Sequence, residues 1–241
     1  MSLMIKAESI VKSYSLHSMH DTPVLKGINL EIQKGEFIAF MGPSGAGKST
    51  LLHILGLLDK PDSGNVRGYF PNDSSFEYAQ LKPAASAELR NKHIGFIFQF
   101  HHLLPEFSAL ENVMMPALIA GESVTNAKQK AIVLCEKVGM SHRHDHRPAE
   151  LSGGEQQRIA IARALMNEPS IIIADEPTGN LDSANTRSVL ELIKNIRQER
   201  SLTLLIATHS MDVATMAERI ITLRDGVISS EVTTTNTIPS T

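Results

Sequence analysis

The sequence predicts an α/β fold built on a mostly parallel β-sheet. Three short apolar runs, at residues 37–41, 170–174 and 202–208, have the composition of strands buried on both faces. Helical patterns at residues 48–58 and 183–200 alternate with these runs. Buried strands that alternate with helices are typical of parallel strands joined by crossover connections. A glycine-rich turn after the first run adds a candidate ligand site at the carboxyl end of a strand.

A helical subdomain is predicted at about residues 88–160, inside this alternating pattern. A capping box that begins at Ser108 opens a helix that extends to Ile119. Further helices are predicted at residues 126–138 and 152–166. The chain therefore changes from strand-rich to helix-rich and back again.

The ends of the predicted domain are β-rich. Residues 28–32 alternate between apolar and polar, as a half-buried strand does, whereas the polar residues 71–87 are expected to form a loop. A hairpin turn at Asp225 leads into the last strand. We expect residues 1–230 to form a single domain and residues 231–241 to form a polar tail.

Composition narrows the class of protein. The net charge of −3 gives no general attraction to DNA or RNA. The one cysteine, Cys135, excludes an internal disulfide, fits a reducing compartment and is expected to be a small core residue. The longest apolar stretches have about six residues, far fewer than a membrane span needs. We therefore expect any membrane contact to be made through other chains.

The clearest candidate site is a phosphate-binding loop. Residues 42–49 match the pattern G-x-x-x-x-G-K-[ST] at every fixed position, between an apolar strand and a helix. The glycines let backbone N–H groups close around phosphate oxygens, and the helix N-terminus adds a positive dipole end. Lys48 is expected to reach the β and γ phosphates of ATP, and Ser49 to bind Mg²⁺. The predicted nucleotide contacts in this loop are Gly42, Pro43, Ser44, Gly45, Ala46, Gly47, Lys48, Ser49 and Thr50.

Two adjacent carboxylates end the next apolar strand, at Asp175 and Glu176. Ligands of such sheets gather at the carboxyl ends of the strands. Asp175 is therefore expected to hold Mg²⁺, directly or through water, and Glu176 to act as general base on the attacking water.

A second anion site is predicted at the start of the helix after residue 151. The segment Ser152-Gly-Gly-Glu155 is locally a capping box, but two glycines in a first helical turn are costly. Their presence indicates that the backbone of Gly153 and Gly154 closely approaches something else.

These motifs, in this order, resemble the ATP-binding cassette (ABC) ATPases over nearly the whole chain, to about Ser230. The resemblance implies the ABC-type fold of phosphate-loop NTPases. That fold has a mostly parallel RecA-like core sheet, an N-terminal antiparallel β subdomain and an inserted α-helical subdomain.

The resemblance also assigns roles to single residues. Tyr14 matches the aromatic residue that stacks on adenine, and Gln99 matches the glutamine that senses Mg²⁺ and the γ phosphate. Asp182 matches the aspartate of the loop that crosses the dimer, and His209 matches the switch histidine. The implied catalytic residues are Glu176, His209, Gln99 and Lys48, and the implied Mg²⁺ ligands are Ser49, Gln99 and Asp175.

What the family implies is a homodimer with two ATP sites. The phosphate loop of one copy holds ATP, while Ser152, Gly153 and Gly154 of the other copy close on its γ phosphate. Binding of ATP then joins the copies and hydrolysis separates them.

Within the family, residues 98–113 resemble the ATPases of bacterial lipoprotein-releasing complexes. Two copies are then expected beneath integral membrane subunits of the LolC and LolE type, peripherally at the cytoplasmic face of the inner membrane. Residues 100–107, directly after Gln99, are the segment expected to contact those subunits.

Other classes of ATPase would show different sequence features. The ATPase domain of macrolide exporters has a similar run, usually without the pair His101 and His102, and is fused to a membrane segment. Cell-division ATPases of the family would share the mechanism but act on another process. A DNA-associated ATPase would carry long heptad repeats, which this sequence lacks, and translation-factor relatives usually hold two cassettes. The alternate histidines in residues 142–146 are expected to form a solvated loop rather than a metal site.

Overall fold

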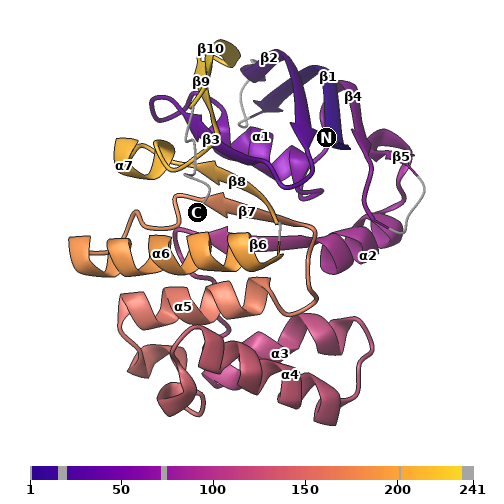
Figure 1. The fold of residues 1–241 in the computed structure, drawn as a ribbon. Helices are drawn as coiled ribbons and strands as arrows, with labels where there is room; N and C mark the ends of the chain where they lie inside the picture. Colours follow the sequence, from indigo (N-terminus) through magenta and orange to yellow (C-terminus); the bar gives the residue numbers. More distant parts are fainter. Residues whose placement is uncertain (1, 16–20, 72–74, 201, 235–241) are drawn as a thin grey trace. The chain divides into compact units, whose positions relative to one another are not determined.

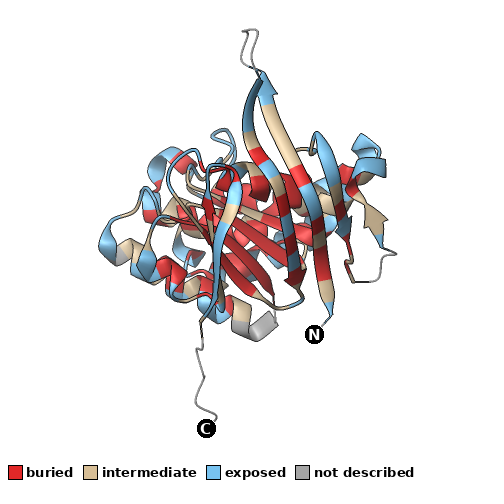
Figure 2. Ribbon diagram, turned by 90° about the horizontal axis from the view of Figure 1, so that it is seen from above, coloured by how far each residue is buried: buried red, intermediate tan, exposed pale blue. Residues whose placement is uncertain are grey.

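Two long strands open the chain, and their side chains alternate between the core and solvent. The computed structural model describes residues 2–15, 21–71, 75–200 and 202–234. An antiparallel sheet in the order β2-β1-β4-β5 consists of β1 (Leu3–Ser15), β2 (Asp21–Gln33), β4 (Ser63–Gly68) and β5 (Phe76–Glu77). Buried bands alternate with exposed ones along the long strands near the N-terminus in Figure 2. The inward face carries Ile5, Ile10 and Ile28, which are almost completely buried.

A second group of strands provides the parallel pairing that the sequence predicts. The order β10-β9-β3-β8 is formed by β3 (Phe37–Met41), β8 (Thr203–Ala207), β9 (Arg219–Arg224) and β10 (Val227–Thr233). β3 pairs in parallel with both β8 and β9, and β10 pairs antiparallel with β9 (Figure 1). Helices α1 (Lys48–Leu55) and α7 (Met211–Ala214) follow β3 and β8. The loop after β3 is therefore carried by a strand that is fixed on both sides.

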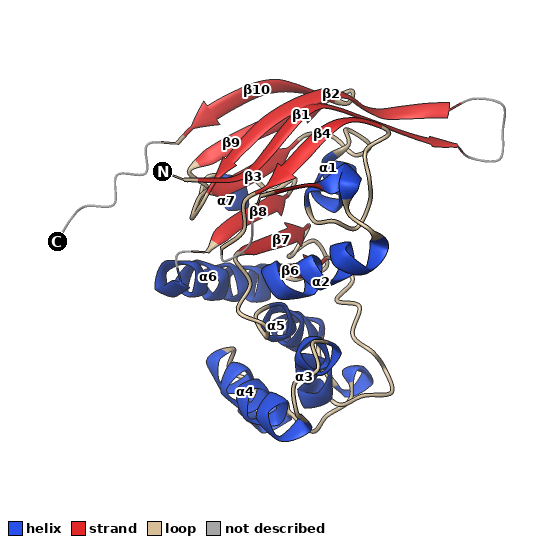
Figure 3. Ribbon diagram, turned by 90° about the vertical axis from the view of Figure 1, so that its right-hand side faces the viewer, coloured by secondary structure: helices blue, strands red, loops and turns tan. Residues whose placement is uncertain are grey.

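The chain divides into two compact units. The first unit is Met1–Pro83 with Thr203–Thr241, and the second unit is Ala84–Leu202. In the second unit, β6 (Ile94–Phe98) and β7 (Ile171–Asp175) pair in parallel. Its helices are α2 (Pro83–His93), α3 (Ala109–Ile119), α4 (Val124–Lys137), α5 (Gly153–Ala164) and α6 (Ser183–Arg200). α3, α4 and α5 pack against one another (Figure 3).

Local sequence signals place several helix starts correctly. Both predicted capping boxes form, at Ser108 before α3 and at Ser152 before α5. Cys135 is buried in α4, as expected, and burial raises the pKa of its thiol to about 11. None of the helices in the described ranges is long and apolar enough to cross a membrane.

Two predicted segments differ from the structure. Residues 71–87 are not a plain loop, because β5, a short helix η1 (Tyr78–Gln80) and the start of α2 lie there. Tyr78 is buried and donates a hydrogen bond to the Leu55 carbonyl, a long-range contact that fixes this segment. The predicted tail begins too early, since β10 continues through Thr233, and residues 235–241 lie outside the described residues. Residues 142–146 are exposed or half-buried, as predicted for a solvated loop, and the backbone carbonyls of His144 and His146 accept hydrogen bonds from the first N–H groups of α3.

Candidate functional site

Three glycines give the loop after β3 a backbone that other residues rarely adopt. Gly42, Gly45 and Gly47 have φ angles of 141°, 79° and 101°. A Cβ atom at Gly42 would lie 2.1 Å from the carbonyl oxygen of Leu223 in β9, so any side chain there would displace the strand. The loop leads directly into α1, whose first N–H groups lack partners within the helix. This geometry suits an anion such as a phosphate group.

Lys48 lies at the start of α1 and is almost completely buried. Its Nζ donates hydrogen bonds to the carbonyls of Gly42 and Pro43, at 2.8 and 3.2 Å. The Nε2 atom of His209, which follows β8, lies 3.5 Å from the same Nζ. The first unit thus brings together two residues that are 161 positions apart. A lysine held inside the loop places a cation where an anion would bind.

Tyr14 lies at the end of β1 with a partly exposed ring. Its hydroxyl donates a hydrogen bond of 2.8 Å to Asp59, which follows α1, and also interacts with Thr50 in the first turn of α1. The ring that is expected to stack on adenine is therefore tied to the helix that begins in the phosphate loop.

The carboxylates of the second unit lie at the end of β7. The register pairs Phe98 with Asp175, so Gln99 and Glu176 follow on neighbouring strands. Asp175 Oδ1 is buried and has no hydrogen-bond partner among the described residues. Carboxylate oxygens are ligands that Mg²⁺ prefers, so Asp175 in the second unit is of the right chemical kind for this ion. In the first unit, Ser49 is exposed, and its hydroxyl is likewise of a kind that binds Mg²⁺. Glu176 has a φ of 46°, which is rare for a residue with a side chain.

A pair of amide side chains fixes Gln99. Its Nε2 donates to Asn180 Oδ1 at 3.1 Å, and Asn180 Nδ2 donates to the Gln99 carbonyl at 3.2 Å. A Cβ atom at Gly179 would lie 2.9 Å from Gln99 Nε2, so Gly179 makes room for this side chain. Two hydrogen bonds therefore join the loop after β7 to the loop after β6.

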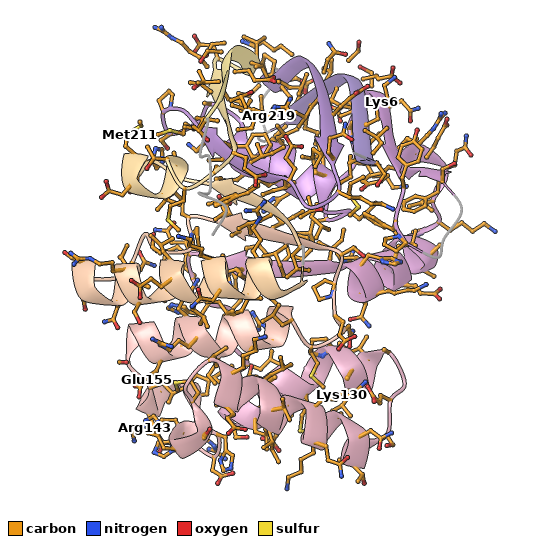
Figure 4. All side chains as sticks on the ribbon, in the orientation of Figure 1. Lys6, Lys130, Arg143, Glu155, Met211 and Arg219 are labelled. Carbon is orange, nitrogen blue, oxygen red and sulfur yellow. The ribbon has the colours of Figure 1, made fainter. Side chains whose placement is uncertain are left out.

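The start of α5 is held by a carboxylate network. Glu155 accepts hydrogen bonds from the backbone N–H and the hydroxyl of Ser152, both at 2.8 Å, and from Arg143 Nε at 3.2 Å. The labels of Glu155 and Arg143 stand one above the other at the lower left of Figure 4. The bonds from Ser152, followed by the charge of Arg143, lower the pKa of Glu155. The N-terminus of α5 is thus fixed in place with Gly153 exposed beside Ser152.

The two glycines of this turn differ in how much room their surroundings leave for a side chain. A Cβ atom at Gly154 would lie 2.5 Å from Asn185 Oδ1, whereas one at Gly153 would meet Leu181 only at an ordinary 3.8 Å. Asn185 is held in turn by Asp182, whose carboxylate accepts from its backbone N–H at 2.9 Å and its Nδ2 at 2.7 Å. Gly154 is thus required within this chain, and Gly153 leaves an open backbone surface.

This difference predicts that alanine at Gly154 destabilises the chain and that alanine at Gly153 does not. Gly154→Ala is expected to lower the free energy of unfolding by about 1–3 kcal/mol, because the new methyl group clashes with Asn185. The matched control Gly153→Ala is expected to change it by less than about 0.5 kcal/mol. Urea unfolding of both variants measures this, and Asn185→Ala should relieve most of the Gly154→Ala loss. Equal stability of the two alanine variants would contradict the assignment.

Sequence reasoning missed three residues that position this site. They are Asp59, Asn180 and Asn185, and each contacts a residue that had been singled out. Asp59 lies in the turn after α1, and the two asparagines lie in a loop and at a helix start, where such residues are common. Nothing in the local pattern indicates their distant partners.

Comparisons with known proteins agree on one family. A family model described as "ABC transporter" matches residues 25–179. The lipoprotein-releasing system ATP-binding protein LolD of Saccharophagus degradans is 49% identical over 228 residues, covering 95% of this chain and 97% of the relative. LolD of Geobacter metallireducens is also 49% identical, over 96% of this chain and the whole relative. The dimeric structure of the ATP-binding cassette MJ0796 bound to ADP and Pi has a TM-score of 0.86 and 39% identity, with 95% of this chain and 98% of that chain covered.

Proposed function

The chain belongs to the ABC transporter family, and from this we propose that it is the ATP-hydrolysing subunit of a lipoprotein-releasing complex of the LolCDE type. The observation that carries this proposal is the 49% identity to LolD, which extends over nearly the full length of both chains. The test is purification of the complex from membranes, followed by ATP-dependent release of a lipoprotein from vesicles. Membrane subunits of another kind in the purified complex would assign the ATPase to a different transport process.

The phosphate loop is the site of the nucleotide in this proposal. Lys48 and the first N–H groups of α1 bind the phosphates, and Ser49, Gln99 and Asp175 provide the ligands of Mg²⁺. When bound, this ion neutralises charge on the phosphate oxygens. Glu176 accepts the proton of the attacking water, while Gln99 and His209 contact the γ phosphate. Two observations support these roles: Lys48 is buried, and Asp175 Oδ1 has no hydrogen-bond partner in the part of the chain that the structure describes.

Two copies of the chain form the active species. The open backbone at Gly153 supports an approach of ATP from the partner copy, because none of the described residues of its own chain requires a glycine there. Ser152, Gly153 and Gly154 of one copy then contact the γ phosphate held by the other, with Asp182 at the crossing. The dimeric MJ0796 cassette provides a precedent for pairing of similar chains.

The membrane subunits contact the second unit at residues 100–107. Phe100, Leu104 and Phe107 are exposed apolar side chains in this segment. A cavity of about 390 Å³ lies next to it, lined in part by Phe98, His102 and Arg163. Arg163 donates to the carbonyls of His101 and His102 at 2.7 and 2.6 Å, so the segment is anchored to α5. Movement of the segment with Gln99 would transmit the state of the nucleotide to the membrane subunits.

Substitutions in this segment are expected to separate transport from ATP binding. The combined change His101→Ala, His102→Asn and Phe107→Ala should lower lipoprotein release about tenfold or more, because truncated interface anchors lose most of a contact. Asparagine is used at 102 because this residue has a φ of 49°. ATP binding should stay within about twofold of the native value. Val133→Ala, at an exposed apolar position on α4, is the control. Full restoration of release in depleted cells by the triple variant would contradict the proposed contact.

A further inference from the structure

Three side chains of the first unit form a cluster around the exposed ring of Tyr14. They are Tyr14 itself, Lys12 two residues before it on β1, and Asp59 in the turn after α1. Lys12 Nζ is 2.9 Å from Asp59 Oδ1, and the Tyr14 hydroxyl is 2.8 Å from Asp59 Oδ2. One carboxylate thus binds a cation and a phenol with its two separate oxygens.

The two faces of the Tyr14 ring are not equally available to a ligand. Lys12 Nζ lies over the ring, 5.2 Å from its centroid, at the distance of a cation–π contact. Lys12 is itself held by Asp59, by the Lys60 carbonyl at 2.8 Å and by Asp62 at 3.5 Å. The cation therefore remains on its side of the ring, which leaves the opposite face for a flat partner.

Asp59 also connects the ring to the phosphate loop. It accepts a hydrogen bond from the Lys60 backbone N–H at 2.7 Å, and its own N–H donates to the His53 carbonyl of α1 at 3.2 Å. The Tyr14 hydroxyl also interacts with Thr50, in the first turn of the same helix. A helix is a rigid spacer, so the ring is held at a fixed offset from the loop at the helix start.

We propose that Asp59 is a positioning residue for nucleotide recognition: by holding Tyr14 and Lys12 together, it presents one ring face to a purine base whose phosphates occupy the loop at Gly42–Ser49. This inference rests on the proposed function, in which Tyr14 stacks on the base. The carboxylate touches neither base nor phosphate, and it acts only through the ring. Its removal leaves the ring present and held only through Thr50, so the stacking contact is lost for part of the time.

The test compares the steady-state ATPase kinetics of full-length variants with Mg²⁺–ATP. Asp59→Ala is expected to raise KM for ATP about fivefold with kcat within about twofold, as loss of a base-stacking contact weakens binding by about this much or more. Tyr14→Phe, which removes only the hydroxyl, should raise KM in the same way. Glu31→Ala is the control, because this carboxylate lies on the same sheet and pairs with Lys6.

Two further readouts distinguish positioning from general damage. Inorganic tripolyphosphate, which has no base, should inhibit native and Asp59→Ala enzyme with the same inhibition constant to within about twofold. In a Tyr14→Ala background, Asp59→Ala should have no additional effect on KM, because its only route of action is already absent. Equal weakening of ATP and tripolyphosphate, or an additive double variant, would overturn the inference.

The same experiment separates this inference from the proposed function. If Tyr14→Ala raises KM and Asp59→Ala does not, the positioning role of Asp59 is wrong and the stacking role of Tyr14 stands. If Tyr14→Ala leaves KM unchanged, the stacking role is wrong and the inference about Asp59 is lost with it.

Discussion

Replacing Glu176 with glutamine is expected to reduce ATP turnover about 100-fold or more, the usual effect of losing a general base, while ATP binding persists. The amide has the shape of the carboxylate but does not accept a proton at neutral pH. Because the copies separate only after hydrolysis in the proposed cycle, the ATP-bound dimer should accumulate. Single-turnover hydrolysis and light scattering in the presence of Mg²⁺–ATP measure these two effects.

The structure offers a matched control for this variant in Glu168. It is also a glutamate with positive φ, at 51° compared with 46° for Glu176, and both residues precede a proline in the second unit. Glu168→Gln therefore makes the same chemical change on a similar backbone, away from the end of β7. It should hydrolyse ATP at the native rate. Turnover near the native rate by Glu176→Gln would remove Glu176 from the role of general base.

The prediction for Glu176 shows what the sequence provides and what it leaves out. The position of the carboxylate was predictable, because a run of buried apolar residues that ends in two acids indicates a strand and its carboxyl end. The positive φ of Glu176 was not predictable, because the conformation of the loop depends on two further contacts. The N–H of Gly179 donates to the Glu176 carbonyl, and Asn180 pairs with Gln99. That pairing joins residues 81 positions apart.

The same distinction between local patterns and distant contacts explains which parts of the fold were predictable. Capping boxes at Ser108 and Ser152 were predictable because donor and acceptor lie three residues apart. The region around Tyr78 was mistaken for a loop because its burial depends on Leu55, 23 positions away, and on stacking of Phe76 against the tyrosine ring. Strand register and tertiary contacts determine the structure of such segments, and a local sequence pattern contains little information about either.

Replacing Lys48 with methionine is expected to weaken ATP binding about 100-fold or more, because the proposed charge-assisted contact with phosphate is removed from a buried position. Methionine has a similar length and fills the same space, so the loss reports the ammonium group itself. The carbonyls of Gly42 and Pro43 would also lose their donor, at a cost of about 1–3 kcal/mol in the free energy of unfolding where water does not replace it. Titration calorimetry with Mg²⁺–ATP measures the first effect, and thermal unfolding measures the second.

Lys34→Met is the control for Lys48, since Lys34 is an exposed lysine in the same unit. It should bind ATP as the native protein does, so a shared loss in both variants would indicate a general effect of net charge. Lys48→Arg tests geometry as well as charge: the guanidinium keeps the cation, but its planar fork does not reproduce the contacts of a compact ammonium group with two carbonyls. We therefore expect this variant to bind ATP more weakly than the native chain and more tightly than Lys48→Met. Binding of ATP by Lys48→Met within about threefold of the native affinity would show that the loop N–H groups alone hold the phosphates, and the lysine would then have only a structural role.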